Sequence, residues 1–318
     1  MQCLSVNKLA GLRAAALANS QAVRSQVHII RQLDRVRTVA QRTDVQYVFP
    51  ANYDQALRQA QEAVKAAVLD GHKILEVDFP VGGLTGVQGD GEGQTEMNAC
   101  MGYLRQFMNA WRQEASTTRI FFPDSGELAV ALSGQNQDPV AGRAALEPQF
   151  ADSRFQLGYL TKQNAAWALF GVNFDKWSPA ELVKDTDTLI IVAYPWFNPK
   201  EELSATLDLY ERKAKGLDIP MVIFNGDLDK IRGSYHIPML APVLSKISDS
   251  LIPKVTAAYY IHNFKGSRPG ALFYRYPGPW QVLRRNPTDP EVPMKVIWTG
   301  TERPTLKQVS LEILPSDL

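Results

Sequence analysis

Two short apolar runs with a helical segment between them constrain the fold of this chain most strongly. DTLIIVAYP, ending at Pro195, and IPMVIFNGDLD, ending at Asp229, each contain an unbroken apolar stretch of strand length. Strands without polar alternation are typical of parallel sheets that helices cover on both faces. The intervening NPKEELSATLDLYERKAKG begins with Asn198 and Pro199, has acids early and lysines late, and predicts a helix. This unit therefore predicts two parallel strands joined by a helix.

The rest of the chain extends the alternation of strands and helices. Further helices are predicted from Tyr53 to Gly71, from Thr95 to Ala115, around Leu240 to Ser250 and after Pro304. Strands are predicted in HKILEVDFP, TRIFFP, ELAVALS, KVTAAYYIHNF, ALFYRYP and MKVIWTG, with a short one from Phe155 to Leu160. TRIFFP and ELAVALS are expected to flank a turn at Pro123, Asp124, Ser125 and Gly126, which makes Asp124 a turn residue rather than an acid catalyst.

This pattern predicts an α/β fold, a mostly parallel sheet with helices on both faces. The strands after residue 255 follow one another without long helices, so we expect an antiparallel extension at the C-terminal edge. No internal repeat or low-complexity linker divides the sequence. Residues 44–318 are therefore expected to form a single α/β domain.

The first 43 residues differ in composition from the rest. They contain seven basic residues against Asp34 alone, seven alanines, scattered serines and no continuous apolar core. A secretory signal needs an apolar core, whereas an organelle transit peptide has this basic, alanine-rich composition. Residues 1–43 are therefore interpreted as an organelle transit peptide. A native basic amphipathic helix is the alternative.

Charge limits the partners of the remaining chain. The whole sequence has 34 basic and 33 acidic side chains, so removal of seven and one leaves 27 and 32, a net charge near −5. Affinity for nucleic acid depends on Lys and Arg neutralising phosphates, so nucleic acid is not expected as the main partner. Cys3 and Cys100 cannot form a disulfide framework, which fits a reducing compartment. No run is long enough to span a bilayer, although peripheral membrane association stays open.

The glycine-rich segment VGGLTGVQGDGEGQTE, residues 81–96, lies between a predicted strand and a predicted helix. This is the layout of a phosphate-binding loop, but neither the G-x-G-x-x-G nor the G-x-x-x-x-G-K spacing is present. Asp90, Glu92 and Glu96 would also repel a phosphate and already favour the positive end of the helix. We interpret the segment as a surface loop. A divalent cation is conceivable, although the calcium-loop pattern is missing.

Common catalytic and metal-binding motifs are absent from the sequence. The histidines His28, His72, His236 and His262 have no metal-ligand spacing, and neither H-E-x-x-H nor C-x-x-C occurs. G-x-S-x-G is also missing, so a hydrolase nucleophile elbow is not supported. No cofactor, metal ion or catalytic residue is predicted.

Polar and aromatic residues follow the two buried strands. AYPWFNP ends one strand and FNGDLD follows the other. Ligands of open α/β sheets bind beyond the carboxyl ends of strands, so adjacent parallel strands would bring Tyr194, Trp196, Asn225 and Asp227 to one crevice. Asn225 and Gly226 followed by an aspartate are also the composition of a plain turn, which we favour.

The segment FKGSRPGALFYRYPGPWQVLRR, residues 264–285, mixes basic and aromatic side chains without an acid. Arginine and aromatic residues are enriched in interface hot spots, and similar mixtures bind anionic lipid or RNA. An edge hairpin with aromatics facing the core explains the same pattern. Both readings stay open. The residues that a partner would contact are Arg275, Tyr276, Trp280, Arg284 and Arg285.

GALFYRYPGPWQVLRR, FPDSGELAVAL and the strand-helix-strand unit resemble a plastid and cyanobacterial domain-of-unknown-function family, numbered nineteen ninety-five. The matching residues are Tyr276 to Trp280, Phe122, Asp124 and Gly126, and the resemblance covers about residues 48–314. The family has no established catalytic motif. Its plant members include a chloroplast factor needed for the accumulation of photosystem II.

The resemblance implies a non-enzymatic protein of the chloroplast stroma, or loosely attached to thylakoids, that assists photosystem II assembly. Its implied partners are photosystem II core subunits or the thylakoid insertion machinery. The alternative is an α/β enzyme or a nucleotide- or metabolite-binding module that uses the crevice near Tyr194 and Asn225. RNA binding through residues 264–285 is a third hypothesis, which the acidic charge disfavours.

Overall fold

The first strand of the chain, β1 (Ile74–Asp78), lies inside the sheet rather than at its edge. A computed structural model describes residues 47–86, 93–133, 150–162, 178–232, 242–286 and 294–316. In these residues nine strands form one sheet in the order β3-β2-β4-β5-β1-β6-β7-β8-β9. The strands from β3 to β6 in this order are parallel, and β7, β8 and β9 are antiparallel. The predicted mostly parallel sheet with a C-terminal antiparallel extension is confirmed.

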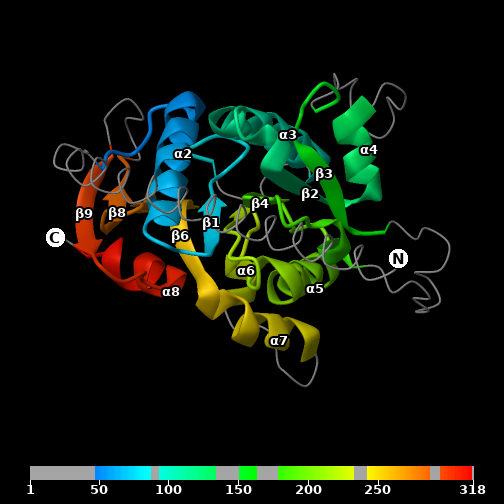
Figure 1. Cartoon of the computed structure of the whole chain (residues 1–318). Helices are drawn as coiled ribbons and strands as arrows, with labels where there is room; N and C mark the ends of the chain where they lie inside the picture. The colour runs from blue at the N-terminus through cyan, green and yellow to red at the C-terminus, as the bar shows by residue number, and fades with distance from the viewer. Residues whose placement is uncertain are drawn as a thin grey trace, which may run out of the picture. The chain divides into compact units, whose positions relative to one another are not determined.

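Helices separate most of the successive strands before β6 (Figure 1). The helices are α2 (Tyr53–Leu69), α3 (Gly93–Met108), α4 (Ser125–Ser133), α5 (Pro199–Leu209), α6 (Asp229–Arg232), α7 (Pro242–Ser250) and α8 (Leu306–Gln308). The other strands are β2 (Thr118–Asp124), β3 (Gln156–Thr161), β4 (Leu189–Ala193), β5 (Met221–Phe224), β6 (Val255–Phe264), β7 (Gly270–Arg275), β8 (Trp280–Arg284) and β9 (Lys295–Gly300).

Helices cover both faces of the sheet. One apolar cluster joins α2, α3 and α4 to one face, and a second joins α5, α6 and α7 to the opposite face. Figure 1 shows these two groups of helices on opposite sides of the strands. Strands β4 and β5 are completely buried and pair in parallel, as their continuous apolar sequence requires.

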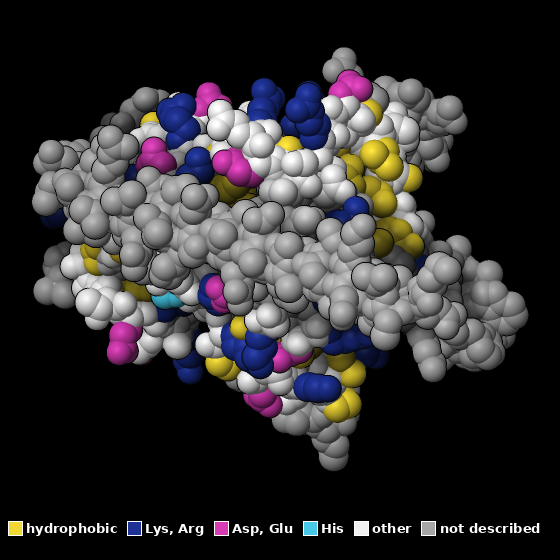
Figure 2. Space-filling view, in the orientation of Figure 1, with side chains coloured by type: hydrophobic (Ala, Val, Ile, Leu, Met, Phe, Trp, Pro, Cys, Tyr) yellow, Lys and Arg dark blue, Asp and Glu magenta, His cyan; other side chains and the backbone are white. Residues whose placement is uncertain are grey.

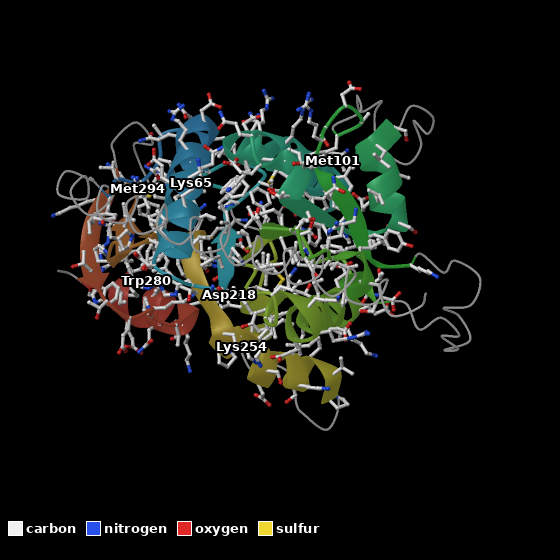
Figure 3. The ribbon with its side chains drawn as sticks, viewed as in Figure 1. Lys65, Met101, Asp218, Lys254, Trp280 and Met294 are labelled. Atoms are coloured by element: carbon white, nitrogen blue, oxygen red, sulfur yellow. The ribbon has the colours of Figure 1, made fainter. Side chains whose placement is uncertain are left out.

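A third apolar cluster lies between the antiparallel strands and the C-terminal helical segment. Its buried members include Tyr260 and Leu272 of the sheet, Trp280 at the start of β8, and Val309 and Leu314 after α8. Figure 3 shows Trp280 on the α8 side of the sheet and Met101 on the α3 side. The antiparallel strands therefore have an apolar core of their own, next to the second cluster.

One predicted strand is a helix. ELAVALS was expected to be extended, but Ser125–Ser133 forms α4, which starts directly after β2 without an intervening turn. The Asp124 carboxylate accepts a hydrogen bond from the Glu127 amide at 2.8 Å, which caps the first turn. Asp124 and Glu127 have the three-residue spacing of a capping box, and the alanines that follow favour a helix over a strand.

Two predictions fall outside the described residues. The expected transit peptide, residues 1–43, lies there, and so does the middle of the glycine-rich segment, residues 87–92. Over the described part of the chain, residues Val48–Leu318 form one compact unit, whose described side chains are coloured by type in Figure 2. None of its described helices combines the length and the apolar character that crossing a membrane requires.

An ion pair is buried at the amino end of β2. The Arg119 Nε atom lies 2.6 Å from Asp187 Oδ2, and both side chains are at most 5% exposed. The Lys184 amide donates a second hydrogen bond to the same carboxylate oxygen. The loop before β4 is therefore tied to β2 by a charge pair that water does not reach.

Replacement of Arg119 by alanine is expected to lower the free energy of unfolding by about 3 to 5 kcal/mol, because it leaves the Asp187 charge buried without a partner. Arg212→Ala is the matched control, since the Arg212 and Asp208 side chains are 55% and 38% exposed. Its cost is expected to stay below about 1 kcal/mol. Urea unfolding measures both, and equal losses would contradict a special role for the buried pair.

Candidate functional site

A network of charged side chains lies on the α6 side of the sheet, between the second and third apolar clusters. Glu76 and Asp78 begin it, because residues 74, 76 and 78 of β1 share one face and only Ile74 is apolar. Both carboxyl groups are at most 2% exposed. A buried carboxylate needs counterions and hydrogen bonds, so the surrounding segments must supply them.

Two arginines from distant parts of the chain supply these contacts to Glu76. Arg232, the last residue of α6, binds both carboxylate oxygens, with nitrogen–oxygen distances of 2.6 and 2.7 Å. Arg303, which follows β9, donates to Glu76 Oε2 at 3.1 Å. The bidentate geometry is the strongest that a guanidinium offers to a carboxylate. Glu76 thus joins β1, α6 and the C-terminal segment.

Asp229 at the start of α6 is the second carboxylate of the network. Its Oδ1 accepts hydrogen bonds from Arg303 at 2.5 Å and from Arg232 at 3.3 Å. Its Oδ2 accepts the hydroxyl of Tyr260 and lies 3.9 Å from His262 Nδ1. The Arg303 guanidinium also stacks over the Tyr260 ring, 4.1 Å from its centroid. These contacts leave Asp229, Arg303 and His262 between 15% and 21% exposed.

The loop after β5 connects the network to the carboxyl edge of the sheet through contacts of Asp227. Asn225 and Asp227 have φ angles of 48° and 47°, which are unfavourable for residues other than glycine. The Asp227 amide donates to Asp78 Oδ2 at 2.9 Å, and the Asp227 carboxylate lies 2.6 Å from Lys230 Nζ. The strained loop therefore holds Asp227 directly beside the end of β1.

The environment moves the pKa values of neighbouring groups in opposite directions. Burial, together with the charge of Asp227, holds the pKa of Asp78 well above its usual range. Burial also acts to raise the pKa of Asp229, but Arg303 and Arg232 outweigh it and the net shift is downward. Burial lowers the pKa of His262. The site therefore combines an acid whose neutral form is favoured, an acid whose charged form is favoured and an imidazole whose neutral form is favoured.

The residues of the predicted crevice take two different positions. The expected adjacency of β4 and β5 is confirmed, and Trp196 and Asp227 both contact Lys230, whose Nζ lies 5.7 Å from the Trp196 ring centroid. Tyr194 is fully buried with a φ of 33°, and its hydroxyl points to Glu127 Oε2 at 3.5 Å. Tyr194 therefore belongs to the scaffold under this edge.

Asn225 is also buried and fastens elements together. Its side-chain oxygen accepts the Phe79 amide at 3.1 Å, and its Nδ2 lies 3.6 Å from Cys100 Sγ in α3. Burial raises the pKa of the Cys100 thiol to about 12, so the thiol is neutral. Asn225 thus links β5, the end of β1 and α3 rather than facing solvent.

The five residues predicted to contact a partner all make contacts within the chain. Arg275 lies 2.6 Å from Glu62, and the Tyr276 hydroxyl donates to Asp70 at 2.9 Å. Trp280 is buried and stacks on Tyr274. Arg284 donates hydrogen bonds to the backbone carbonyls of Leu314 and Ser316, and Arg285 donates one to the backbone carbonyl of Thr85. Their role toward a partner stays a prediction.

Sequence reasoning missed the centre of the network, which consists of Glu76, Asp78, Arg232 and Arg303. HKILEVDFP was predicted to be a strand, but its sequence did not show that both of its faces are buried. The available signal was the pair of acids, Glu76 and Asp78, in a short strand that is otherwise apolar. Across the described residues no group of three or more His, Cys, Asp and Glu side chains is arranged to hold a metal ion.

The mixed nine-stranded sheet with a charged carboxyl edge defines an α/β protein with helices on both faces. Comparison with family models assigns residues 50–311 to the domain of unknown function (DUF1995). The chain therefore belongs to this family, as its sequence resemblance predicted. No curated protein and no solved structure matches the chain.

The opposite pKa shifts predict opposite pH dependences for two substitutions. The folded-state pKa of Asp78 is raised, so the stability that its protonated form contributes is complete below about pH 4 and is lost as the pH rises. The pKa of Asp229 is lowered, so its contribution is present above about pH 4 and is lost as the pH falls.

Asp78→Asn is therefore expected to gain stability relative to the unmodified chain as the pH rises from about 4 to 8, whereas the loss caused by Asp229→Asn is nearly constant over that range and shrinks as the pH falls below about 4. Urea unfolding of the three proteins, both in that range and at more acidic pH, measures the two differences. A difference for Asp78→Asn that does not change with pH would contradict the raised pKa.

Proposed function

We propose that this chain binds a small, uncharged polar molecule at the carboxyl edge of the sheet, beside Trp196, Asp227 and Lys230. The observation that carries the proposal is the strained loop after β5, which holds Asp227 beside the end of β1 and within reach of Lys230 and Trp196. The opposite pKa shifts of Asp78 and Asp229 in the adjoining network agree with this location. Titratable groups that the environment pushes apart are concentrated at functional sites, where one acts as an acid and the other as a base or an electrostatic partner.

The connections of the sheet support this location. Strand β1 continues into α3 on one face, and its neighbour β5 continues into α6 and α7 on the other. In open α/β sheets, ligands bind where adjacent strands connect to opposite faces. Asp78 and Asp227 lie at the carboxyl ends of these two strands. The backbone strain at Asn225 and Asp227 is concentrated at the same point.

The charge balance of the network supports an uncharged ligand. The ion pairs of the network join the acids Glu76, Asp227 and Asp229 to the bases Arg232, Arg303 and Lys230, and burial favours the neutral forms of Asp78 and His262. Three negative and three positive charges cancel. A polyol, sugar or amide can exchange hydrogen bonds with such groups without adding a charge that would need a counterion.

The proposal is tested by identifying any small molecule that co-purifies with the protein. Small molecules released by denaturing the purified full-length chain are identified by mass spectrometry and titrated back by calorimetry. Lys230→Met is expected to weaken binding about three- to tenfold, since a hydrogen bond worth about 1 kcal/mol is lost. Lys230 is 61% exposed, so its removal is expected to leave the melting temperature unchanged.

Lys246→Met is the matched control, because Lys246 is an exposed lysine of α7 that lies outside the network. Absence of any released molecule, together with no binding from a panel of polyols, sugars and amides, would overturn the proposal. Equal affinities of the Lys230 and Lys246 variants would place the binding elsewhere.

A second proposal follows the family resemblance and has one specific observation in its favour. Nε and Nη2 of Arg285 are shielded from water and have no hydrogen-bond partner within the described residues. Once uncovered, these guanidinium nitrogens can bind a carboxylate of another protein in a bidentate manner. We propose that the chain assists photosystem II assembly in the chloroplast stroma or at the thylakoid surface, which is the role that the sequence resemblance implies.

In this second proposal, Arg285→Glu is expected to remove photosystem II core or insertion-machinery subunits from the proteins that a tagged chain captures from solubilised thylakoids. Lys246→Glu, a charge reversal on α7, serves as the control and is expected to leave the capture unchanged. Arg284→Glu is expected to lower the melting temperature, because Arg284 holds the carbonyls of Leu314 and Ser316. Capture that survives Arg285→Glu would argue against this face.

A further inference from the structure

A pocket of about 330 Å³ lies at the amino ends of β2 and β3, away from the charged network. Its wall on one side is the end of α3 and the helical turn that follows, with Arg105, Asn109 and Arg112. These residues are separated by four and three positions, so they lie on one face of the helical segment. The opposite wall is the segment before β3, from Phe150 to Phe155.

The arginines of this pocket are unusual for this protein. Eight described arginines use their side chains in hydrogen bonds or ion pairs: Arg119, Arg212, Arg232, Arg268, Arg275, Arg284, Arg285 and Arg303. The described arginines without such a partner in the described structure are Arg58, Arg105, Arg112 and Arg154. Three of these four line the pocket. Arg105 also complements the carboxyl end of α3, but this explains neither Arg112 nor Arg154.

The other lining residues indicate what the arginines would hold. Asp152 is the one acid of the lining, so three arginines leave a net charge of +2. The Ser153 hydroxyl is buried and has no hydrogen-bond partner among the described residues. Phe150 and Phe155 add apolar surface next to these polar groups. A phosphate ester carries close to two negative charges above about pH 6 and accepts several hydrogen bonds at once.

We propose that this pocket binds a small organic phosphate. The guanidinium groups of Arg105, Arg112 and Arg154 hold the phosphate oxygens, and the hydroxyl of Ser153 donates a further hydrogen bond. Asn109 and Asp152 face the hydroxyl groups of the organic part. The site is independent of the carboxyl-edge function proposed above.

Calorimetry of the full-length chain with inorganic phosphate and with ribose 5-phosphate tests the proposal. Saturable binding of both is expected, with ribose 5-phosphate the tighter, and none of unphosphorylated ribose. Arg112→Gln and Arg154→Gln are each expected to raise the dissociation constant about tenfold, as the loss of one charged hydrogen bond predicts. Arg58→Gln is the matched control, since Arg58 is an exposed arginine of α2 that lies outside the pocket and has no side-chain partner among the described residues.

The affinity is also expected to fall below about pH 6, where the phosphate gains its second proton. Both arginines are exposed, so thermal unfolding is expected to give the same melting temperature for all variants. No saturable binding of either phosphate compound would overturn the proposal. Malate binding as tightly as ribose 5-phosphate would overturn the phosphate assignment, and equal effects of the Arg58 and Arg154 substitutions would overturn the location.

Discussion

A single buried carboxylate determines much of how this protein is assembled. Glu76 lies on β1, inside the sheet, and its charge can be buried only because Arg232 and Arg303 reach it. These arginines belong to α6 and to the segment after β9, so two regions far apart in the sequence must be correctly placed before the charge is satisfied. The requirement links the parallel and antiparallel parts of the sheet through one acid. Apolar residues at the same positions could pack as well, but they would not demand these particular partners.

The network also divides the α6 face of the sheet into two apolar regions. On one side lie α5 and α7, and on the other lies the C-terminal helical segment over β7 and β8. The polar strip between them ends at the carboxyl edge, where the strained residues Asn225 and Asp227 lie. Strain of this kind persists only where surrounding contacts hold the backbone, and the contacts of Asn225 with Phe79 and Cys100 provide that support.

The amino acid sequence predicts the elements that depend on local pattern. The apolar runs of β4 and β5 fixed the parallel core, and the lack of helices after residue 255 indicated the antiparallel part. ELAVALS was wrongly predicted to be a strand, because a short apolar segment has no clear periodicity. The hydrogen bond between the Asp124 carboxylate and the Glu127 amide caps a helix there instead. The charged network was missed because its members become neighbours only through the order of the strands.

The residues of the candidate site also fall into those that local sequence pattern predicts and those that only the folded structure brings together. Trp196 and Asp227 were expected at one edge of the sheet because both follow buried parallel strands, and in the structure both contact Lys230. It could not show that Tyr194 and Asn225 turn inward, since this depends on positive φ angles and on hydrogen bonds to β1 and α4. Nor could it pair Glu76 with Arg303, because no spacing rule connects side chains 227 positions apart.

The position of β1 has a consequence for the chain as it leaves the ribosome. Its partners are β5 and β6, and the Phe79 amide that follows it bonds a side chain 146 residues further along. The nascent strand must therefore wait in water while most of the protein is still being synthesised. Without Glu76 and Asp78 it would be a short apolar segment prone to aggregation, and ionised acids counteract such association. The carboxyls that burial later makes costly thus keep the unpaired strand soluble during synthesis.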